Sequence, residues 1–187
     1  MKNTLVTRNF TPDFEVRSSS RTIAGLAVPF GTITDLGHER EFFVRGSFAR
    51  TIAERGVGYV KLLAQHGAGG GFAIGKATVL REDAAGLYAE FAVANTRDGT
   101  EALELASSGV VDGLSVGFVV VRDDYPEHDL RAIHEAKLRE ISLVNFAQYP
   151  DAKVLSVRAA EDILNNLEGD TGLHQIELAE RQMETLI

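Results

Sequence analysis

A serine between two glycines is the residue of this sequence best suited to nucleophilic chemistry. Residues 113–118 read GLSVGF and are followed by three valines. Such β-branched residues favour an extended strand, and glycines leave room beside a strand for another backbone, as a bound peptide would need. Ser115 is therefore a candidate nucleophile. The alternative is a buried strand serine that only hydrogen-bonds a neighbouring backbone group.

The pattern Gly-x-Ser-x-Gly also matches the nucleophile elbow of α/β-hydrolases. That elbow needs a strand before its serine and a helix after it. The valines that follow Ser115 predict a strand instead of a helix. The context therefore argues against this class of hydrolase.

A serine hydroxyl needs a base to take its proton, and five histidines could serve. His66 ends the apolar run 59–66 and precedes the glycine-rich run 67–71, so we expect it at the edge of a cleft. The glycine-rich run lacks the lysine of a phosphate-binding loop. The other four histidines lie in charged or turn-rich surroundings and are expected on the surface: His38, His128, His134 and His174.

The third group of such a site is an acid that orients the histidine and stabilises its charged form. Glu140 lies in the apolar run 131–144, where an unpaired carboxylate is costly, and strand alternation places it on the same face as Ser142. Glu140 is therefore the candidate acid. A structural ion pair with an arginine is the alternative role for it, and Asp112 and Glu135 are the next acids to consider.

Short apolar or alternating runs between turn residues predict many strands and few helices. Helices are expected after Ser47 as N-cap and from Asp98, which forms a capping-box pattern with Glu101. Residues 122–130 read as a charged loop. This pattern predicts a mainly β, α+β fold, a closed or nearly closed β-barrel with flanking helices. The predicted strands are 21–30, 41–45, 59–66, 72–80, 86–94, 113–121, 131–144 and 152–157.

Length and composition limit the classes of protein that fit. A chain of 187 residues suits one domain, and the absence of cysteine excludes disulfides and zinc-thiolate sites. We expect a domain over 1–158, opening with a loose arm or edge strand over 1–20, and an acidic amphipathic tail over 159–187. The tail reads as a solvated pair of surface helices, as a segment that docks on a partner, or as one that is removed. No run predicts a signal peptide or membrane span, and a net charge of −8 argues against nucleic-acid binding.

Six motifs within residues 21–158 occur in an order that resembles the prohead maturation protease family of tailed phages. They are GLAVPFG, EFFVRGSF, KLLAQH, GLSVGF, LREISLV and PDAKVLSVR. That family is related in fold to the herpesvirus assemblins, so the resemblance implies a barrel of that type. It also implies that His66 is the catalytic histidine, Ser115 the nucleophile and Glu140 the acid. Two features depart from the family pattern: Gly67 replaces a common aspartate, and residues 145–150 replace a small-residue and proline pattern where the oxyanion site is expected.

The function implied by this resemblance is a serine endopeptidase without metal or cofactor. It would cleave scaffold, or the scaffold-like segment of the major capsid protein, during prohead maturation, and would also cleave itself. Its expected place is the immature capsid in the host-cell cytoplasm. Its expected partners are the capsid and scaffold proteins and further copies of the chain.

Two other functions stay open on the sequence. One is a catalytically inactive capsid-assembly or scaffolding protein on the same fold. The other is a small-ligand-binding β-barrel, for which the sequence offers no polar constellation beyond the residues already assigned.

Overall fold

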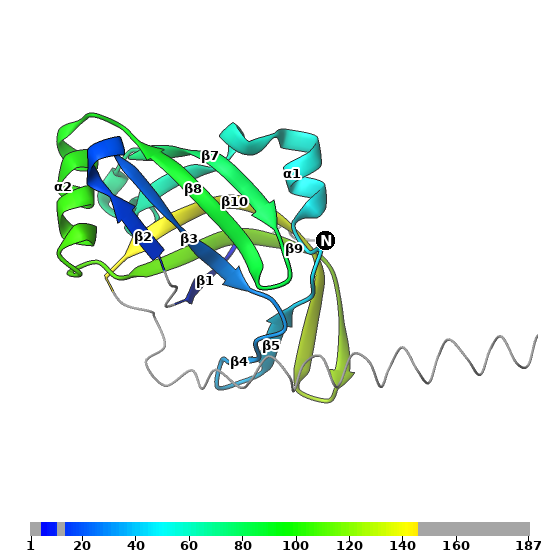
Figure 1. The fold of residues 1–187 in the computed structure, drawn as a ribbon. Coiled ribbons are helices and arrows are strands. Elements are labelled where there is room, and N and C mark those ends of the chain that lie inside the picture. The colour runs from blue at the N-terminus through cyan, green and yellow to red at the C-terminus, as the bar shows by residue number, and fades with distance from the viewer. Residues whose placement is uncertain (1–4, 11–13, 146–187) are drawn as a thin grey trace, which may run out of the picture.

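One curled sheet makes up most of the molecule (Figure 1). The computed structural model of the chain describes residues 5–10 and 14–145. Within them the main path of the sheet runs β1-β9-β10-β6-β7-β8-β3-β2, and β5 joins it beside β10 with β4 attached. The strands are β1 (Val6–Phe10), β2 (Phe14–Arg17), β3 (Thr22–Pro29), β4 (Thr34–Asp35), β5 (Arg40–Phe43), β6 (Lys61–Ala64), β7 (Gly75–Glu82), β8 (Gly86–Val93), β9 (Gly113–Glu127) and β10 (Leu130–Val144).

Two α-helices accompany the sheet in this part of the chain, α1 (Ala49–Arg55) and α2 (Arg97–Ser107). Short 3-10 turns complete it: η1 (Ser18–Ser20), η2 (Val57–Tyr59) and η3 (Gln65–Gly70). The prediction of a mainly β fold with few helices is therefore confirmed. No helix among the described residues is long and apolar enough to cross a membrane.

The expected closure of the barrel is wrong. The sheet is an open half-barrel, because β1 and β2 lie at opposite ends of the strand order and do not pair with each other. Both strands come from the segment 1–20, whose edge-strand alternative this arrangement matches. Each end of the sheet therefore finishes in a strand from the amino-terminal part of the chain.

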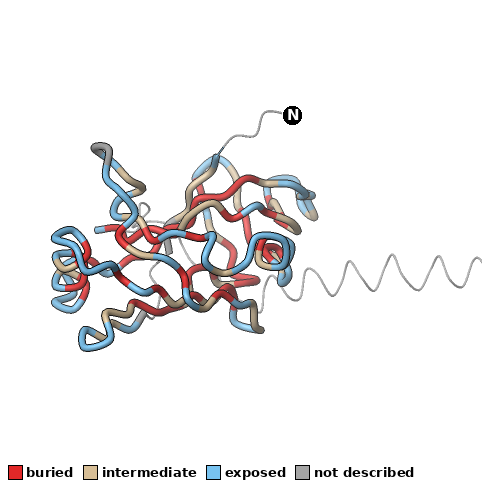
Figure 2. The backbone as a smooth tube through the Cα atoms, turned by 90° about the horizontal axis from the view of Figure 1, so that it is seen from above, coloured by how far each residue is buried: buried red, intermediate tan, exposed pale blue. Residues whose placement is uncertain are grey.

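The core lies in the middle of the molecule, where buried segments gather and exposed segments lie around them (Figure 2). Strand β8 shows the underlying pattern, since its alternate side chains Leu87, Ala89, Phe91 and Val93 are buried as predicted. Near α1, three rings pack together: the centroid of Phe43 lies 5.3 Å from that of Phe48 and 5.1 Å from that of Phe118. Apolar burial of this kind is the main stabilising contribution to the fold.

The predicted charged loop at 122–130 is wrong, because β9 and β10 continue through most of it as a long hairpin. Its polar side chains are paired across the strands. Arg131 Nε on β10 lies 2.6 Å from Asp123 Oδ2 on β9. Cross-strand pairs of opposite charge stabilise a strand pair that an apolar pattern would not reveal.

A register shift in β10 changes which residues face the core. Leu138 lies opposite Phe118, whereas Glu140 lies opposite Gly117, so the ladder is irregular between them. Leu138 is buried in the core with Ile141, while Glu140 belongs to the other face. Strict alternation along this strand would put Leu138 on the same face as Glu140, and it fails across such an irregularity.

Both helix starts differ from the predicted caps. The Ser47 hydroxyl donates to the carbonyls of Val44 and Ile133, and α1 has Phe48 at its N-cap position instead. At α2 the N-cap is Thr96, whose Oγ1 accepts from Gly99 N at 3.1 Å, and Asp98 lies in the first turn. Serine, threonine and aspartate side chains can each bond several nearby backbone groups, so the sequence alone does not fix which one caps a helix.

The expected strand 152–157 and the tail 159–187 lie outside the described residues. The division of the chain at residue 158 therefore stays a prediction.

Candidate active site

Ser115 lies on β9 between two strands of the sheet. It is opposite Asn9 of β1 on one side and opposite Ser142 of β10 on the other. Its side chain is fully buried, and its hydroxyl donates to the carbonyl oxygen of Arg8 at 3.1 Å. The strand prediction is confirmed, and the bond to a backbone carbonyl is the one that the structural alternative described.

His66 reaches the same region by a turn at the end of β6. Strand β6 runs parallel to β10, with Leu63 opposite Ser142. After it, Gln65, His66 and Gly67 have φ values of 48°, 57° and 70°. This left-handed backbone is rare for residues other than glycine. Strand β6 ends at Ala64, and His66 belongs to η3. The prediction that His66 ends the strand is therefore wrong.

Hydrogen bonds hold this turn against β10. The His66 N–H donates to Ser142 Oγ at 3.2 Å. Gln65 Nε2 donates to Asn145 Oδ1 at 2.6 Å. Both bonds join η3 to the end of β10, so the turn carries the imidazole to that strand instead of past it.

Glu140 makes the central contact of the site. Its Oε1 lies 2.8 Å from His66 Nδ1, and its Oε2 accepts a hydrogen bond from Ser142 Oγ at 2.5 Å. The side chain is only 13% exposed. Among the described residues the charge partner of Glu140 is thus His66, and the arginine pair considered as an alternative is not formed.

Gly117 provides the space for this carboxylate. It lies opposite Glu140, and a Cβ added at residue 117 would overlap Glu140 Oε1 and come within 3.0 Å of its carboxyl carbon. The sequence suggested that Gly117 makes room for another backbone. The structure shows that it makes room for the candidate acid.

The second ring nitrogen of His66 is free to act. Its Nε2 is buried and has no hydrogen-bond partner among the residues that the structure describes. With Nδ1 turned to a carboxylate, Nε2 is the atom available to accept a proton. Directly opposed residues share a face of an antiparallel pair, so Ser115, Ser142, Gly117 and Glu140 all belong to one face. His66 and Glu140 are in contact on this face, whereas the Ser115 hydroxyl is bonded to Arg8.

The other candidate residues lie elsewhere. Asp112 is exposed, and Glu135 Oε1 lies 3.2 Å from Arg50 Nη1. His38 and His128 are exposed, as expected. His134 is the exception, since it is half-buried beside Asp124, and His174 is outside the described residues.

Two residues of the site were not singled out as functional from the sequence. Ser142 bonds both Glu140 and the His66 backbone, and its two-residue spacing from Glu140 was the available signal. Arg8 gave no signal, because a single arginine in a polar arm has no periodic context. The segment 146–150, near which an oxyanion site was expected, lies beyond the described residues. No group of three or more histidine and acidic side chains that could hold a metal ion occurs within 5–10 and 14–145.

Comparison with known proteins gives a consistent picture. A family model described as "Caudovirus prohead serine protease" matches residues 12–166. The "Probable capsid maturation protease" of Lactococcus phage p2 is 29% identical over 129 residues, covering 66% of this chain and 71% of that protein. The "Prohead protease" of Enterobacteria phage HK97 is 33% identical over 93 residues, covering 48% of this chain and 41% of that protein.

The fold also has a solved counterpart. The bacteriophage T4 capsid assembly protease aligns with a TM-score of 0.53 and 13% sequence identity, covering 75% of this chain and 97% of that one. At this identity the likeness concerns the fold alone.

Proposed function

Because the chain belongs to the caudovirus prohead serine protease family, we propose that it is a maturation endopeptidase in which Ser115, His66 and Glu140 form the catalytic triad. The observation that carries the proposal is the 2.8 Å contact between His66 Nδ1 and Glu140 Oε1, with Nε2 left unpartnered. A carboxylate bonded to Nδ1 fixes the tautomer in which Nε2 accepts a proton.

The proposed mechanism assigns one role to each of these three residues. The Ser115 hydroxyl leaves the Arg8 carbonyl and turns to His66 Nε2, which takes its proton as Oγ bonds the substrate carbonyl carbon. Glu140 stabilises the imidazolium that forms. The imidazolium then protonates the amine as the C–N bond breaks, and water hydrolyses the acyl-enzyme with His66 again as base.

The proposed substrates are scaffold, or the scaffold-like segment of the major capsid protein, and the chain itself. Support comes from the relatives, which are named as a prohead protease and a probable capsid maturation protease. Cleavage would take place inside the immature capsid, in the host-cell cytoplasm. Association with capsid subunits and with further copies of the chain belongs to the same proposal.

The test is incubation of the purified full-length protein with the capsid subunit of its own phage, followed by mass spectrometry of the products. We expect discrete fragments from the wild type and none from Ser115→Ala or His66→Ala. Circular dichroism would verify that both variants fold. Fragments of equal yield from Ser115→Ala would overturn the assignment of the nucleophile.

A catalytically inactive assembly protein is the second candidate. One observation favours it: Ser115 is buried and bonded to a backbone carbonyl instead of to His66. The same incubation separates the two functions, because an inactive protein would bind the capsid subunit and leave its mass unchanged.

A further inference from the structure

Strand β1 occupies the edge of β9 in the manner of a bound peptide. It pairs antiparallel with β9, with Thr7 opposite Gly117 and Asn9 opposite Ser115. An extended peptide that adds a strand to a sheet edge makes this type of ladder. The Arg8 carbonyl oxygen, 3.1 Å from Ser115 Oγ, lies where a scissile carbonyl would have to come.

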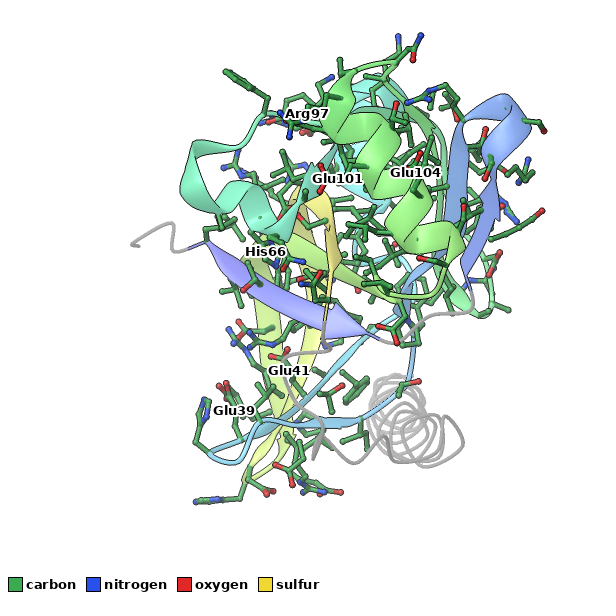
Figure 3. The ribbon with its side chains drawn as sticks, turned by 90° about the vertical axis from the view of Figure 1, so that its left-hand side faces the viewer. Glu39, Glu41, His66, Arg97, Glu101 and Glu104 are labelled. Atoms are coloured by element: carbon green, nitrogen blue, oxygen red, sulfur yellow. The ribbon has the colours of Figure 1, made fainter. Side chains whose placement is uncertain are left out.

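The side chain of Arg8 is held by a buried acid. Its guanidinium donates to both carboxylate oxygens of Glu41 on β5, through Nε to Oε1 and through Nη2 to Oε2 at 3.1 Å. Glu41 is 1% exposed, and Arg8 is the side chain with which it forms an ion pair within the described part of the chain. Figure 3 shows β1 crossing between the labelled His66 and Glu41. A buried carboxylate is costly without a partner, and an arginine fork matches it geometrically.

The match to the family model begins at residue 12, after β1 ends at Phe10. Strand β1 is therefore outside the region that the family model recognises, whereas β9 and Glu41 are inside it.

We propose that the edge of β9 and the Glu41 carboxylate form the peptide-binding site, that this site takes an extended segment with arginine at the position of Arg8, and that β1 fills it as a tethered pseudosubstrate. The inference rests on the proposed function and adds its substrate class. In this register Ser115 Oγ would bond the carbonyl carbon of the arginine, and the bond to the following residue would break. In β1 the hydroxyl donates to that carbonyl oxygen instead of to His66, which corresponds to an inhibited arrangement.

Binding tests the site without requiring catalysis. The probes are fluorescent peptides Val-Thr-Arg-Asn-Phe, with the sequence of β1, and the same peptide with glutamine for arginine. The protein is the full chain carrying Ser115→Ala and Arg8→Ala, in which β1 has lost its anchor. We expect the arginine peptide to bind at least about tenfold more tightly than the glutamine peptide, because the latter leaves a buried charge unpaired. Adding Glu41→Gln should remove the difference.

A matched arginine controls for general effects. Arg17 lies on β2 at the other end of the sheet and pairs with Glu15 and Glu90 near the surface. Full-length protein with Ser115→Ala and Arg17→Ala keeps β1 anchored and should bind the arginine peptide at least about tenfold more weakly than the Arg8→Ala protein. If Arg8→Ala prevents folding, Thr7→Pro can replace it. Proline removes a backbone N–H from β1 and leaves Arg8 and Glu41 unsubstituted.

Cleavage then distinguishes this inference from the proposed function. With Ser115 restored, Arg8→Ala should cut the arginine peptide between arginine and asparagine, faster than the wild type does. Equal binding of the two peptides, or cleavage at another bond, would overturn the inference while leaving a working protease. Selective arginine binding without any cleavage of peptide or capsid subunit would uphold the binding site and reject the proposed function.

Discussion

At the scale of single residues, the two oxygens of Glu140 have different partners. Oε1 faces the His66 ring and Oε2 accepts from Ser142, whose oxygen in turn accepts from the His66 backbone. The carboxylate is therefore fixed from two sides. Such an arrangement sets both the orientation of the imidazole and its tautomer.

Replacing Glu140 by glutamine should lower kcat by about a thousandfold or more, because a neutral amide no longer stabilises the imidazolium and can hold the wrong tautomer. Glu135→Gln is the matched control on the same strand, since Glu135 forms its ion pair with Arg50 instead of with His66. Steady-state kinetics on the capsid subunit would measure both. A Glu140→Gln enzyme at the wild-type rate would show that another acid serves His66.

Gly117→Ala tests whether space beside the carboxylate matters. A methyl group at residue 117 overlaps Glu140 Oε1, so the carboxylate must move away from His66 and kcat should fall by about tenfold or more. Gly58→Ala is the control, because a Cβ there meets nothing within 4 Å and the backbone is not left-handed. Unchanged kcat in Gly117→Ala would mean that the position of Glu140 is not critical.

At the scale of elements, the site depends on where irregular segments meet regular strands. The left-handed residues of η3 turn His66 onto β10, and the register shift in β10 places Glu140 away from the core. Helix α1 supports that shift: Thr51 Oγ1 donates to the Ala136 carbonyl and accepts from the Leu138 N–H, both at 3.2 Å. The position of α1 is in turn coupled to β7, because the Phe48 N–H donates to Glu82 Oε1 at 2.8 Å.

That last contact predicts a dependence of stability on pH. Burial raises the pKa of the Glu82 carboxyl and outweighs the opposing effect of the Phe48 N–H. A carboxyl with a higher pKa in the folded chain binds its proton more tightly there, so the free energy of unfolding falls as pH rises from the ordinary pKa through the raised one. Glutamine does not ionise. Glu82→Gln should therefore become more stable relative to the wild type as pH rises above the ordinary carboxyl pKa of about 4.

Urea unfolding across this pH range would measure the difference. Glu54→Gln is an informative comparison, because the hydrogen bond from Arg50 lowers the pKa of Glu54. The contribution of Glu54 to stability is therefore lost as pH falls below the ordinary carboxyl pKa of about 4, so its pH dependence has the opposite sign and lies at more acidic pH. A difference between Glu82→Gln and the wild type that stays constant with pH would contradict the prediction.

At the scale of the whole molecule, the open half-barrel explains how one chain could both bind and mask a peptide site. A closed barrel has no free edge, whereas this sheet ends in β1 and β2. Strand β1 covers the edge next to Ser115 through backbone pairing and the Arg8–Glu41 ion pair. The edge of β9 can become available only when that strand leaves.

Self-cleavage is the prediction that belongs to this scale. Wild-type protein incubated at high concentration should lose mass from a terminal segment, such as the tail 159–187, whereas Ser115→Ala should keep its full mass. Intact-mass spectrometry of both proteins, expressed and stored identically, provides the measurement. Equal full-length masses under conditions in which the wild type cleaves the capsid subunit would argue against self-cleavage.

The sequence by itself determined which residues could do the chemistry and where most of the strands and helices lie, because both depend on local patterns. The GLSVGF run predicted a strand, and alternation placed Glu140 with Ser142. The strand predicted to end at His66 ends at Ala64, because the turn of η3 begins at Gln65. The charged stretch 122–127 was missed, because its strand depends on partners such as Arg131 and Glu39 that lie elsewhere in the chain.

Only the tertiary structure decided which distant groups meet. His66 and Glu140 are 74 positions apart and Arg8 and Ser115 are 107 apart, and no local pattern encodes either contact. Strand pairing and the register shift in β10 set them, and these are selected by burial of the whole sheet. The left-handed backbone at His66 likewise exists only because its bonds to β10 offset the cost of that conformation.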